Sequence, residues 1–174
     1  MQSRHLKLLA AATLTAWSLT AGLAQAAGVL TIGCREDSTT FDPIKSAQNR
    51  DTWVFANVYD TLVRVDNLGT KMEPGLAESW DISKDGLTYT FHLNEKMNFS
   101  NGHKLDSADV VWSINQLIEK QYLDSDAIES VSKIEAVDAD TVKMTLSEPD
   151  SNLLWNLTGR PGLVFDKDAK YDLK

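Results

Sequence analysis

A polar segment near residue 40 carries side chains suited to recognising a small ligand. Residues 35–43 read Arg-Glu-Asp-Ser-Thr-Thr-Phe-Asp-Pro and follow a short apolar run, Val29–Gly33. Charged and hydroxyl side chains of this kind form hydrogen bonds and ion pairs with polar solutes. The apolar run predicts a strand, and open α/β sheets usually bind ligands at the carboxyl ends of their strands. Because Pro43 restricts Asp42 to an extended conformation, we expect this segment to be a loop.

The other reactive side chains form no catalytic or metal-binding pattern in the sequence. The three histidines are His5, His92 and His103, and none has partners at metal-ligand spacing. Asp138 and Asp140 share a tight turn, but a calcium loop also needs a glycine at its sixth position and a glutamate at its twelfth. The sequence contains no nucleophile elbow and no glycine-rich phosphate loop. We therefore expect no metal, no cofactor and no enzymatic activity.

The composition describes an acidic globular chain. The 174 residues include 43% hydrophobic residues and carry a formal net charge of −8. The hydrophobic content is high enough for a folded core, in one domain or slightly more. An acidic surface is repelled by phosphate backbones and by anionic membranes, so we expect no nucleic-acid partner.

The N-terminus has the organisation of a secretory signal peptide. Arg4 and Lys7 precede an apolar run over residues 8–23, and Ala24-Gln25-Ala26 has the small-x-small pattern of a cleavage site. A retained membrane anchor is the alternative, although a span usually needs about 20 apolar residues. We interpret residues 1–27 as a signal peptide that is removed during secretion.

Cys34 is the only cysteine, which excludes an internal disulfide. Ile32-Gly33-Cys34 partly resembles the end of a lipobox, so lipidation is one alternative. Thr31 is a poor fit to that motif, and the Ala24-Gln25-Ala26 site lies well upstream. We expect Cys34 to be a buried thiol at the end of a strand, where cysteine packs like a small hydrophobic residue.

The clearest local pattern lies between Pro74 and Asn115. Apolar residues alternate with polar ones from Leu87 to Leu93, as do Trp80 and Ile82 before them, which predicts two half-buried strands. Ser83-Lys84-Asp85-Gly86 lies between these strands and has the Asp-Gly pair typical of a hairpin turn. A further turn is expected at Ser100-Asn101-Gly102.

A capped helix is predicted after this hairpin. Asp106 is a suitable N-cap, and Asp109 follows three residues later, as in a capping box. The apolar residues after the cap fall on one helical face. These residues are Val110, Val111, Ile114, Leu117 and Ile118.

The remaining segments predict short elements. An apolar stripe made by Val54, Val58 and Leu62, with Phe55 and Tyr59, predicts a helix over Asn49–Leu62. A turn at Asp66–Gly69 follows a short strand, Leu62–Val65. The further expected elements are a hairpin around Asp138–Asp140, a short helix at Leu153–Leu157 and a strand beginning at Leu163–Phe165.

The order of these motifs resembles the family 5 extracellular solute-binding proteins. These proteins are the periplasmic peptide-, nickel- and oligopeptide-binding components of ABC importers. The segments that carry the resemblance are Pro74–Trp80, Ser83–Leu93, Phe99–Gly102 and Ser107–Val110. A Tyr-Asp-x-Leu-Val run at Tyr59–Val63 and Ser147-Glu148-Pro149 also match the family pattern.

The resemblance implies an α/β fold of mixed helices and strands, of the type II periplasmic-binding-protein class. Family members have two lobes around a cleft and are much longer, so we expect this chain to be the N-terminal portion, with a mixed sheet, hairpins and short helices. Residues 28–48 would begin the first lobe, 49–160 would form its extra α/β domain, and 161–174 would return toward that lobe. The second lobe would be absent.

The resemblance also implies a binding site and partners. The family lines one wall of its cleft with a loop bearing a Leu-Asp-Pro signature, which reads Phe41-Asp42-Pro43 here. The predicted ligand-binding residues are therefore Arg35, Glu36, Asp37, Ser38 and Thr39. The expected partners of this monomer are a small peptide or other small solute and the ABC permease subunits. A secreted hydrolase domain and an interaction or chaperone-like module remain as alternatives.

Overall fold

The computed structural model describes Gly33, residues 36–43, Ser46 and residues 48–169. The chain divides into two compact units, Met1–Arg35 and Glu36–Lys174. All the elements below belong to the second unit. The predicted signal peptide at 1–27, the lipidation alternative at Cys34 and most of the predicted first strand lie outside the described residues.

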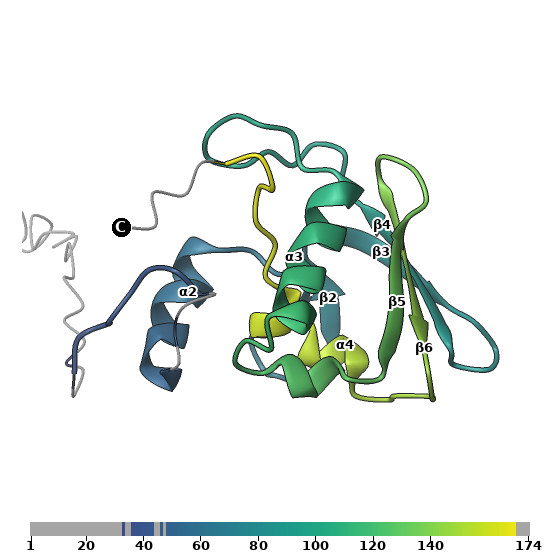
Figure 1. Ribbon diagram of the computed structural model, residues 1–174, viewed down its shortest axis with the longest axis horizontal. Coiled ribbons are helices and arrows are strands. Elements are labelled where there is room, and N and C mark those ends of the chain that lie inside the picture. The colour runs from purple at the N-terminus through teal and green to yellow at the C-terminus, as the bar shows by residue number, and fades with distance from the viewer. Residues whose placement is uncertain (1–32, 34–35, 44–45, 47, 170–174) are drawn as a thin grey trace, which may run out of the picture. The chain divides into compact units, whose positions relative to one another are not determined.

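A four-stranded sheet forms one side of this unit, on the right in Figure 1. Its strands are β3 (Ala77–Ile82), β4 (Thr88–Leu93), β5 (Val131–Ala136) and β6 (Thr141–Leu146). They lie in the order β3-β4-β6-β5, and the three pairings between neighbours are antiparallel. Both predicted hairpins are therefore present, β3–β4 and β5–β6.

The alternating pattern of β4 places one face of this strand in the core. Tyr89, Phe91 and Leu93 are buried, whereas the residues between them are partly exposed. The turn before β4 forms as predicted, with Gly86 at φ +71° and its N–H donating to the carbonyl of Ser83 over 2.9 Å. Ile82 differs from the prediction and is 48% exposed, because it lies on the edge strand near the hairpin end.

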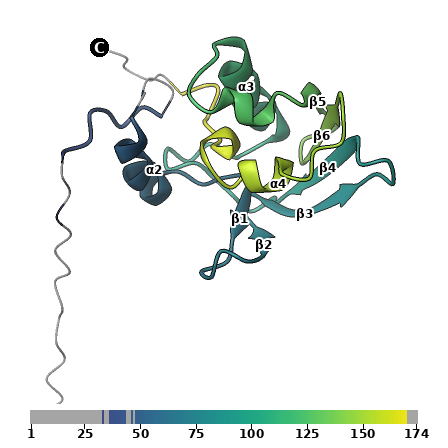
Figure 2. The same cartoon turned by 90° about the horizontal axis from the view of Figure 1, so that it is seen from below.

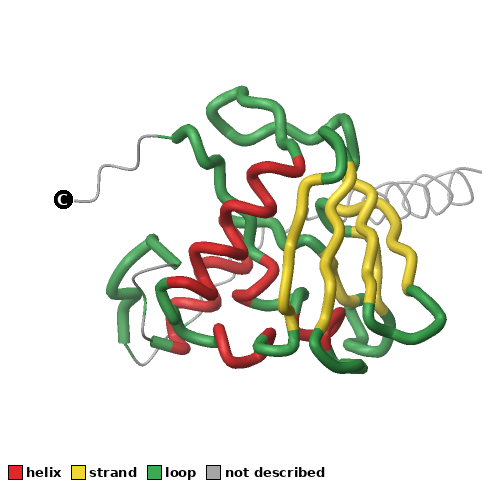
Figure 3. The backbone as a smooth tube through the Cα atoms, turned by 45° about the vertical axis from the view of Figure 1, so that its right-hand side comes forward, coloured by secondary structure: helices red, strands yellow, loops and turns green. Residues whose placement is uncertain are grey.

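Helix α3 (Ser107–Glu119) covers the apolar face of the sheet (Figure 3). Its predicted capping box is present: the Asp106 carboxylate accepts from the Asp109 N–H over 3.1 Å, and the Asp109 carboxylate accepts from the Asp106 N–H over 3.0 Å. Val110 and Ile114 are completely buried in the main core. The sequence pattern therefore predicted both the start of this helix and its packed face.

The predicted helix over Asn49–Leu62 is shorter in the structure. A 3₁₀ turn (Asn49–Asp51) leads into α2 (Thr52–Val58), and the backbone becomes extended at Tyr59. The prediction was wrong about the last residues because Leu62 packs in the main core instead, where its N–H donates to the carbonyl of Gly162 over 2.7 Å.

A smaller two-stranded sheet follows α2. Strands β1 (Val63–Val65) and β2 (Met72–Pro74) pair antiparallel around the predicted turn, in which Gly69 has φ +68°. Figure 2 shows this hairpin projecting from the four-stranded sheet. Glycine at position 75 allows the chain to pass close to the carbonyl oxygens of Thr61 and Leu62, where a Cβ atom would collide.

The last described segment passes back beside α2. It contains α4 (Leu153–Asn156) and a 3₁₀ turn (Arg160–Gly162). Another 3₁₀ turn (Ser125–Ile128) lies earlier in the chain, between α3 and β5. The expected strand at Leu163 is reduced to one antiparallel bridge with Thr61. A search of the described part of the chain finds no helix long and apolar enough to cross a membrane.

Apolar packing is unevenly distributed in this unit. The main core joins the four-stranded sheet, α3 and α4. A second cluster is much smaller and consists of Phe55 from α2 with Leu163 and Phe165. The segment before α2, which includes the predicted ligand-binding loop, contributes no buried apolar side chain to either cluster among its described residues.

Candidate functional site

The predicted ligand-binding loop is held by a buried carboxylate. Asp51 is completely buried, and its Oδ1 accepts from the Ser38 hydroxyl over 2.9 Å and from the Thr39 N–H over 3.0 Å. Its Oδ2 accepts from the hydroxyls of Thr39 and Ser46, each over 2.7 Å. The hydrogen bond from Ser46 outweighs burial, and with those from Thr39 and Ser38 it holds the pKa of Asp51 well below its usual range. Asp51 therefore stays ionised and fixes this loop.

A buried arginine holds the same segment from the other side. Arg160 Nη1 donates to the carbonyls of Pro43 over 2.9 Å and Ser46 over 3.1 Å, and its Nε donates to Asp124 over 3.2 Å. The guanidinium also lies over the Phe55 ring, 5.3 Å from the ring centroid. Ser46 is thus held twice, through its hydroxyl by Asp51 and through its carbonyl by Arg160.

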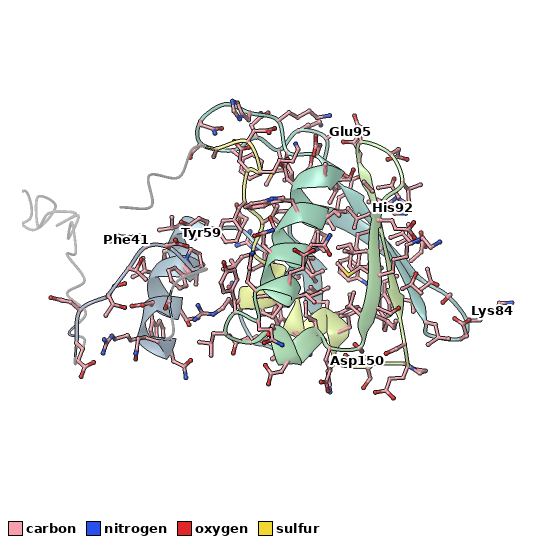
Figure 4. The ribbon with its side chains drawn as sticks, viewed as in Figure 1. Phe41, Tyr59, Lys84, His92, Glu95 and Asp150 are labelled. Carbon is pink, nitrogen blue, oxygen red and sulfur yellow. The ribbon has the colours of Figure 1, made fainter. Side chains whose placement is uncertain are left out.

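The outer side of the loop makes more exposed contacts. Glu36 forms an ion pair with Arg50. The Tyr59 hydroxyl donates to the carbonyl of Phe41 over 2.9 Å, and Figure 4 shows these two side chains close together. Partial burial and the negative charge of Asp42 raise the pKa of Tyr59, so its hydroxyl remains a donor. The Phe41 side chain is 68% exposed.

These contacts separate the five predicted site residues into groups. Glu36 and Asp37 are exposed at the surface, and the Glu36 carboxylate also pairs with Arg50. Ser38 and Thr39 direct their hydroxyl hydrogens to Asp51, so they position the loop and offer lone pairs rather than free donors. Arg35 lies outside the described residues.

Sequence reasoning did not identify Asp51 or Arg160. Asp51 lies at the start of the expected helix, where an acidic residue usually serves the helix end. Arg160 lies in the Gly159-Arg160-Pro161-Gly162 segment, whose glycines and proline indicate only the end of a helix. The contacts of Arg160 reach 117 residues back along the chain to Pro43, and no local pattern signals a contact of that range.

Two histidines form pairs with carboxylates elsewhere in this unit. His92 Nε2 lies 3.0 Å from Asp81 on the exposed face of the sheet, and His103 Nδ1 lies 2.7 Å from the buried Asp166. Burial opposes ionisation of Asp166, but the hydrogen bonds from Asn101, the Asp168 N–H and His103 lower its pKa overall. Within the described ranges, no group of three or more His, Cys, Asp or Glu side chains could hold a metal ion.

A hollow of about 530 Å³ lies beside this second pair, between Tyr59, the loop at 97–101 and the segment 164–169. Its size is that of a small-molecule site. However, two of its polar groups, Asn101 and Asp166, already bond to each other over 2.6 Å. These two groups are therefore already satisfied within the protein.

Comparison with known proteins gives a consistent result. Residues 71–174 match the family described as bacterial extracellular solute-binding proteins, family 5 Middle. The di/tripeptide-binding protein 1 of Pseudomonas aeruginosa (strain UCBPP-PA14) is 32% identical over 161 residues, which cover 80% of this chain and 30% of that protein. The chain therefore spans less than a third of the length of this relative.

Solved structures extend the likeness to the fold. The periplasmic binding protein DppA of Helicobacter pylori, in complex with the peptide STSA, has a TM-score of 0.66 and 30% identity over 76% of this chain and 30% of its own. MoaA of A. tumefaciens R10, in complex with mannopinic acid, has a TM-score of 0.69 and 31% identity over 76% of this chain and 28% of its own. These relatives are binding proteins, and they confirm the mixed α and β fold of the type II periplasmic-binding-protein class. The chain belongs to the family 5 bacterial extracellular solute-binding proteins.

Proposed function

We propose that this chain forms part of the periplasmic solute-binding component of an ABC importer for peptides or similarly small solutes. The observation that carries the proposal is its 32% identity to a di/tripeptide-binding protein across 80% of the chain. The exposed, firmly anchored loop at 36–43 supports it, because a fixed loop positions polar groups without a large ordering cost on binding.

In this proposal the loop forms one wall of a cleft. Glu36 and Asp37 face the solute, together with Arg35, while Ser38 and Thr39 orient the backbone through Asp51. Proteins of this kind bind by closing two lobes, which removes water from the solute and completes its hydrogen bonds. One wall supplies only some of those bonds, so the 174-residue chain alone should bind a solute weakly.

The proposed domain arrangement follows the sequence expectation. Residues 28–48 begin the first lobe, 49–160 form its extra α/β domain, and 161–174 return to the first lobe. The hydrogen bond from Leu62 to Gly162 and the Thr61–Leu163 bridge support this boundary, since the chain returns beside its own entry point there.

Export to the periplasm is the remaining part of the proposal. We place the cleaved signal at residues 1–27, with an inner-membrane permease as the partner and a monomer as the working state. Mass spectrometry of the periplasmic fraction should find a mature N-terminus at Ala27 or Gly28. An N-terminus at a lipid-modified Cys34, or an uncleaved chain in the membrane fraction, would contradict this part.

Uptake measurements test the function in the cell. Deleting the gene should abolish import of labelled tri-alanine and related di- and tripeptides, and the restored gene should recover it. Import of free alanine should remain unchanged, which controls for general damage to the membrane. Unchanged uptake of the whole peptide panel would overturn the proposal. Calorimetry with the same panel tests the weak binding of the chain alone, which micromolar affinity would contradict.

A further inference from the structure

Arg160 carries a hydrogen-bond donor that the surrounding protein does not satisfy. Its side chain is only 4% exposed. The Nη1 and Nε groups are occupied, as described above, but Nη2 has no hydrogen-bond partner among the residues that the structure describes. Buried polar atoms in folded proteins almost always have a partner, so an unpaired N–H on a buried cation needs an explanation.

A small cavity lies beside this arginine. Arg160 lines it together with Pro43, Tyr122 and Phe165, and the free volume is about 10 Å³. A volume of this size holds one oxygen-sized atom and excludes a whole solute molecule. The cavity is not fully enclosed, so an atom that enters it can belong to a larger molecule lying outside.

The cavity also adjoins the candidate binding loop. Pro43, at the end of that loop, both lines the cavity and accepts a hydrogen bond from Arg160 Nη1 over 2.9 Å. A solute that contacts Pro43 therefore lies beside this cavity. The cavity and the loop were identified from different observations, and they meet at the same residue.

The charges around Arg160 favour an anionic oxygen. Among the described residues, Asp124 is the carboxylate paired with the guanidinium, and its side chain is 46% exposed and therefore partly screened by water. The other acceptors are neutral carbonyls. Ser113, which also lines the cavity, donates to the Asp109 carbonyl over 2.7 Å and accepts from the Phe165 N–H over 2.9 Å. An incoming carboxylate oxygen would form a charge-assisted hydrogen bond, which is stronger than a neutral one.

We propose that Arg160 is a ligand-binding residue whose Nη2 donates to one carboxylate oxygen of the solute. The second carboxylate oxygen and the rest of the solute lie outside the cavity, against the loop that ends at Pro43. This inference rests on the proposed solute-binding function and makes it more specific, because it selects solutes that carry a carboxylate beside this loop.

The first test uses acetate as the probe and acetamide as its neutral counterpart of equal size. NMR spectra of the 174-residue chain should show a saturable shift of the Arg160 Nε–H signal and of the Ser46 and Phe165 amides on adding acetate. Acetamide should bind at least about tenfold more weakly. The exposed Arg64 serves as the internal control and should not saturate. Equal responses to the two probes, a response at Arg160 no larger than at Arg64, or no response would overturn the inference.

A variant pair sharpens the result. Arg160→Lys keeps the charge but loses the planar fork, and it should remove the acetate shifts at Ser46 and Phe165. Arg64→Lys, on exposed β1, should leave them unchanged. Persistence of the shifts in a folded Arg160→Lys protein would overturn the inference. If Arg160→Lys does not fold, the wild-type comparison of acetate with acetamide decides the matter.

The outcome is separable from that of the proposed function. Lost peptide uptake in the deletion strain without an acetate response at Arg160 would overturn this inference alone. An acetate response at Arg160 with unchanged peptide uptake would overturn the proposed function and leave the anion site standing.

Discussion

Different interactions stabilise the hairpin-and-helix scaffold and the candidate binding loop. The scaffold over residues 74–146 is held by a hydrogen-bonded sheet and by an apolar face covered by α3. The loop at 36–43 and the nearby Ser46 are held mainly by two buried charges, Asp51 and Arg160. Figure 4 shows the labelled residues Phe41 of the loop and Lys84 of the hairpin tip on opposite sides of the view.

This difference separates fold from recognition. A packed sheet tolerates little displacement, because each side chain fills space against its neighbours. The outer side chains of a loop anchored by ionic hydrogen bonds need not pack in a core. Residues such as Glu36 and Asp37 can therefore face a solute. The scaffold thus identifies the family, while the loop carries the groups that we propose to bind.

The largest expected effect comes from removing a large buried side chain from the scaffold core. Phe91→Ala removes a completely buried ring that stacks near Tyr89, with ring centroids 6.4 Å apart. The free energy of unfolding should fall by about 3–5 kcal/mol, as measured by urea denaturation. Thr90→Ala, on the opposite face of β4, should lower it by less than about 1 kcal/mol. Similar losses for both variants would contradict the one-sided core.

A glycine beside Arg160 tests whether the two regions share a boundary. A Cβ atom at Gly162 would collide with the backbone carbonyl of Leu157. Gly162→Ala should therefore lower the free energy of unfolding by roughly 1–3 kcal/mol and shift the Phe55 amide signal, because the turn that carries Arg160 moves. Gly33→Ala, which has open space around its Cβ position, is the matched control. A Gly162→Ala variant with an unchanged free energy of unfolding would show that the turn is not fixed.

The helix cap of the scaffold should have a smaller effect. Asp106→Ala removes the acceptor of the Asp109 N–H and should lower the free energy of unfolding by about 1 kcal/mol. Asp106→Ser retains a capping oxygen and should recover most of that loss. Equal destabilisation by alanine and serine would assign the effect to the Lys167 ion pair at 3.6 Å rather than to the cap.

Removing the loop anchor should affect global unfolding least and the loop most. Asp51→Asn replaces a charged acceptor with an amide that cannot satisfy all of the donors from Ser38, Thr39 and Ser46. Hydrogen-exchange protection of the Thr39 amide should fall at least about tenfold while the urea midpoint changes little. Asp37→Asn, on the same loop and exposed, should leave that protection unchanged. A large fall in the urea midpoint would show that the loop belongs to the cooperative core.

The same carboxylate predicts a pH dependence. The folded pKa of Asp51 lies below its unfolded value, so the ionised group stabilises the loop above about pH 4 and this contribution is lost progressively as the pH falls. The Thr39 protection factor, corrected for intrinsic exchange, should therefore decrease on acidification in the wild-type chain. In Asp51→Asn it should be low and independent of pH. An increase in the Thr39 protection factor on acidification would contradict this prediction.

The sequence predicted the scaffold well because local rules determine it. Alternation from Leu87 to Leu93 indicated the buried face of β4, Asp-Gly indicated its turn, and the Asp106–Asp109 spacing indicated the cap. The predicted end of α2 was wrong because the Leu62 N–H donates to a distant carbonyl, that of Gly162. The contacts of Arg160 could not be predicted for the same reason, since residues so far apart in the sequence produce no periodic pattern.

The predicted site residues illustrate the limit of carrying roles over from a family pattern. The resemblance located the loop but did not distinguish residues that face outward from residues that fix the backbone. Ser38 and Thr39 have the same polar character as Glu36 and Asp37 in the sequence. Only the position of Asp51 separates these two groups.

Titrating the 174-residue chain with tri-alanine, followed by amide NMR, tests the central claim most directly. The account predicts weak, saturable shifts concentrated at Glu36–Thr39, Ser46 and Arg160, with the β3–β4 hairpin signals unchanged. Shifts concentrated on the hairpin residues Ala77–Leu93, or no saturable shift in the loop up to the solubility limit of the peptide, would contradict it.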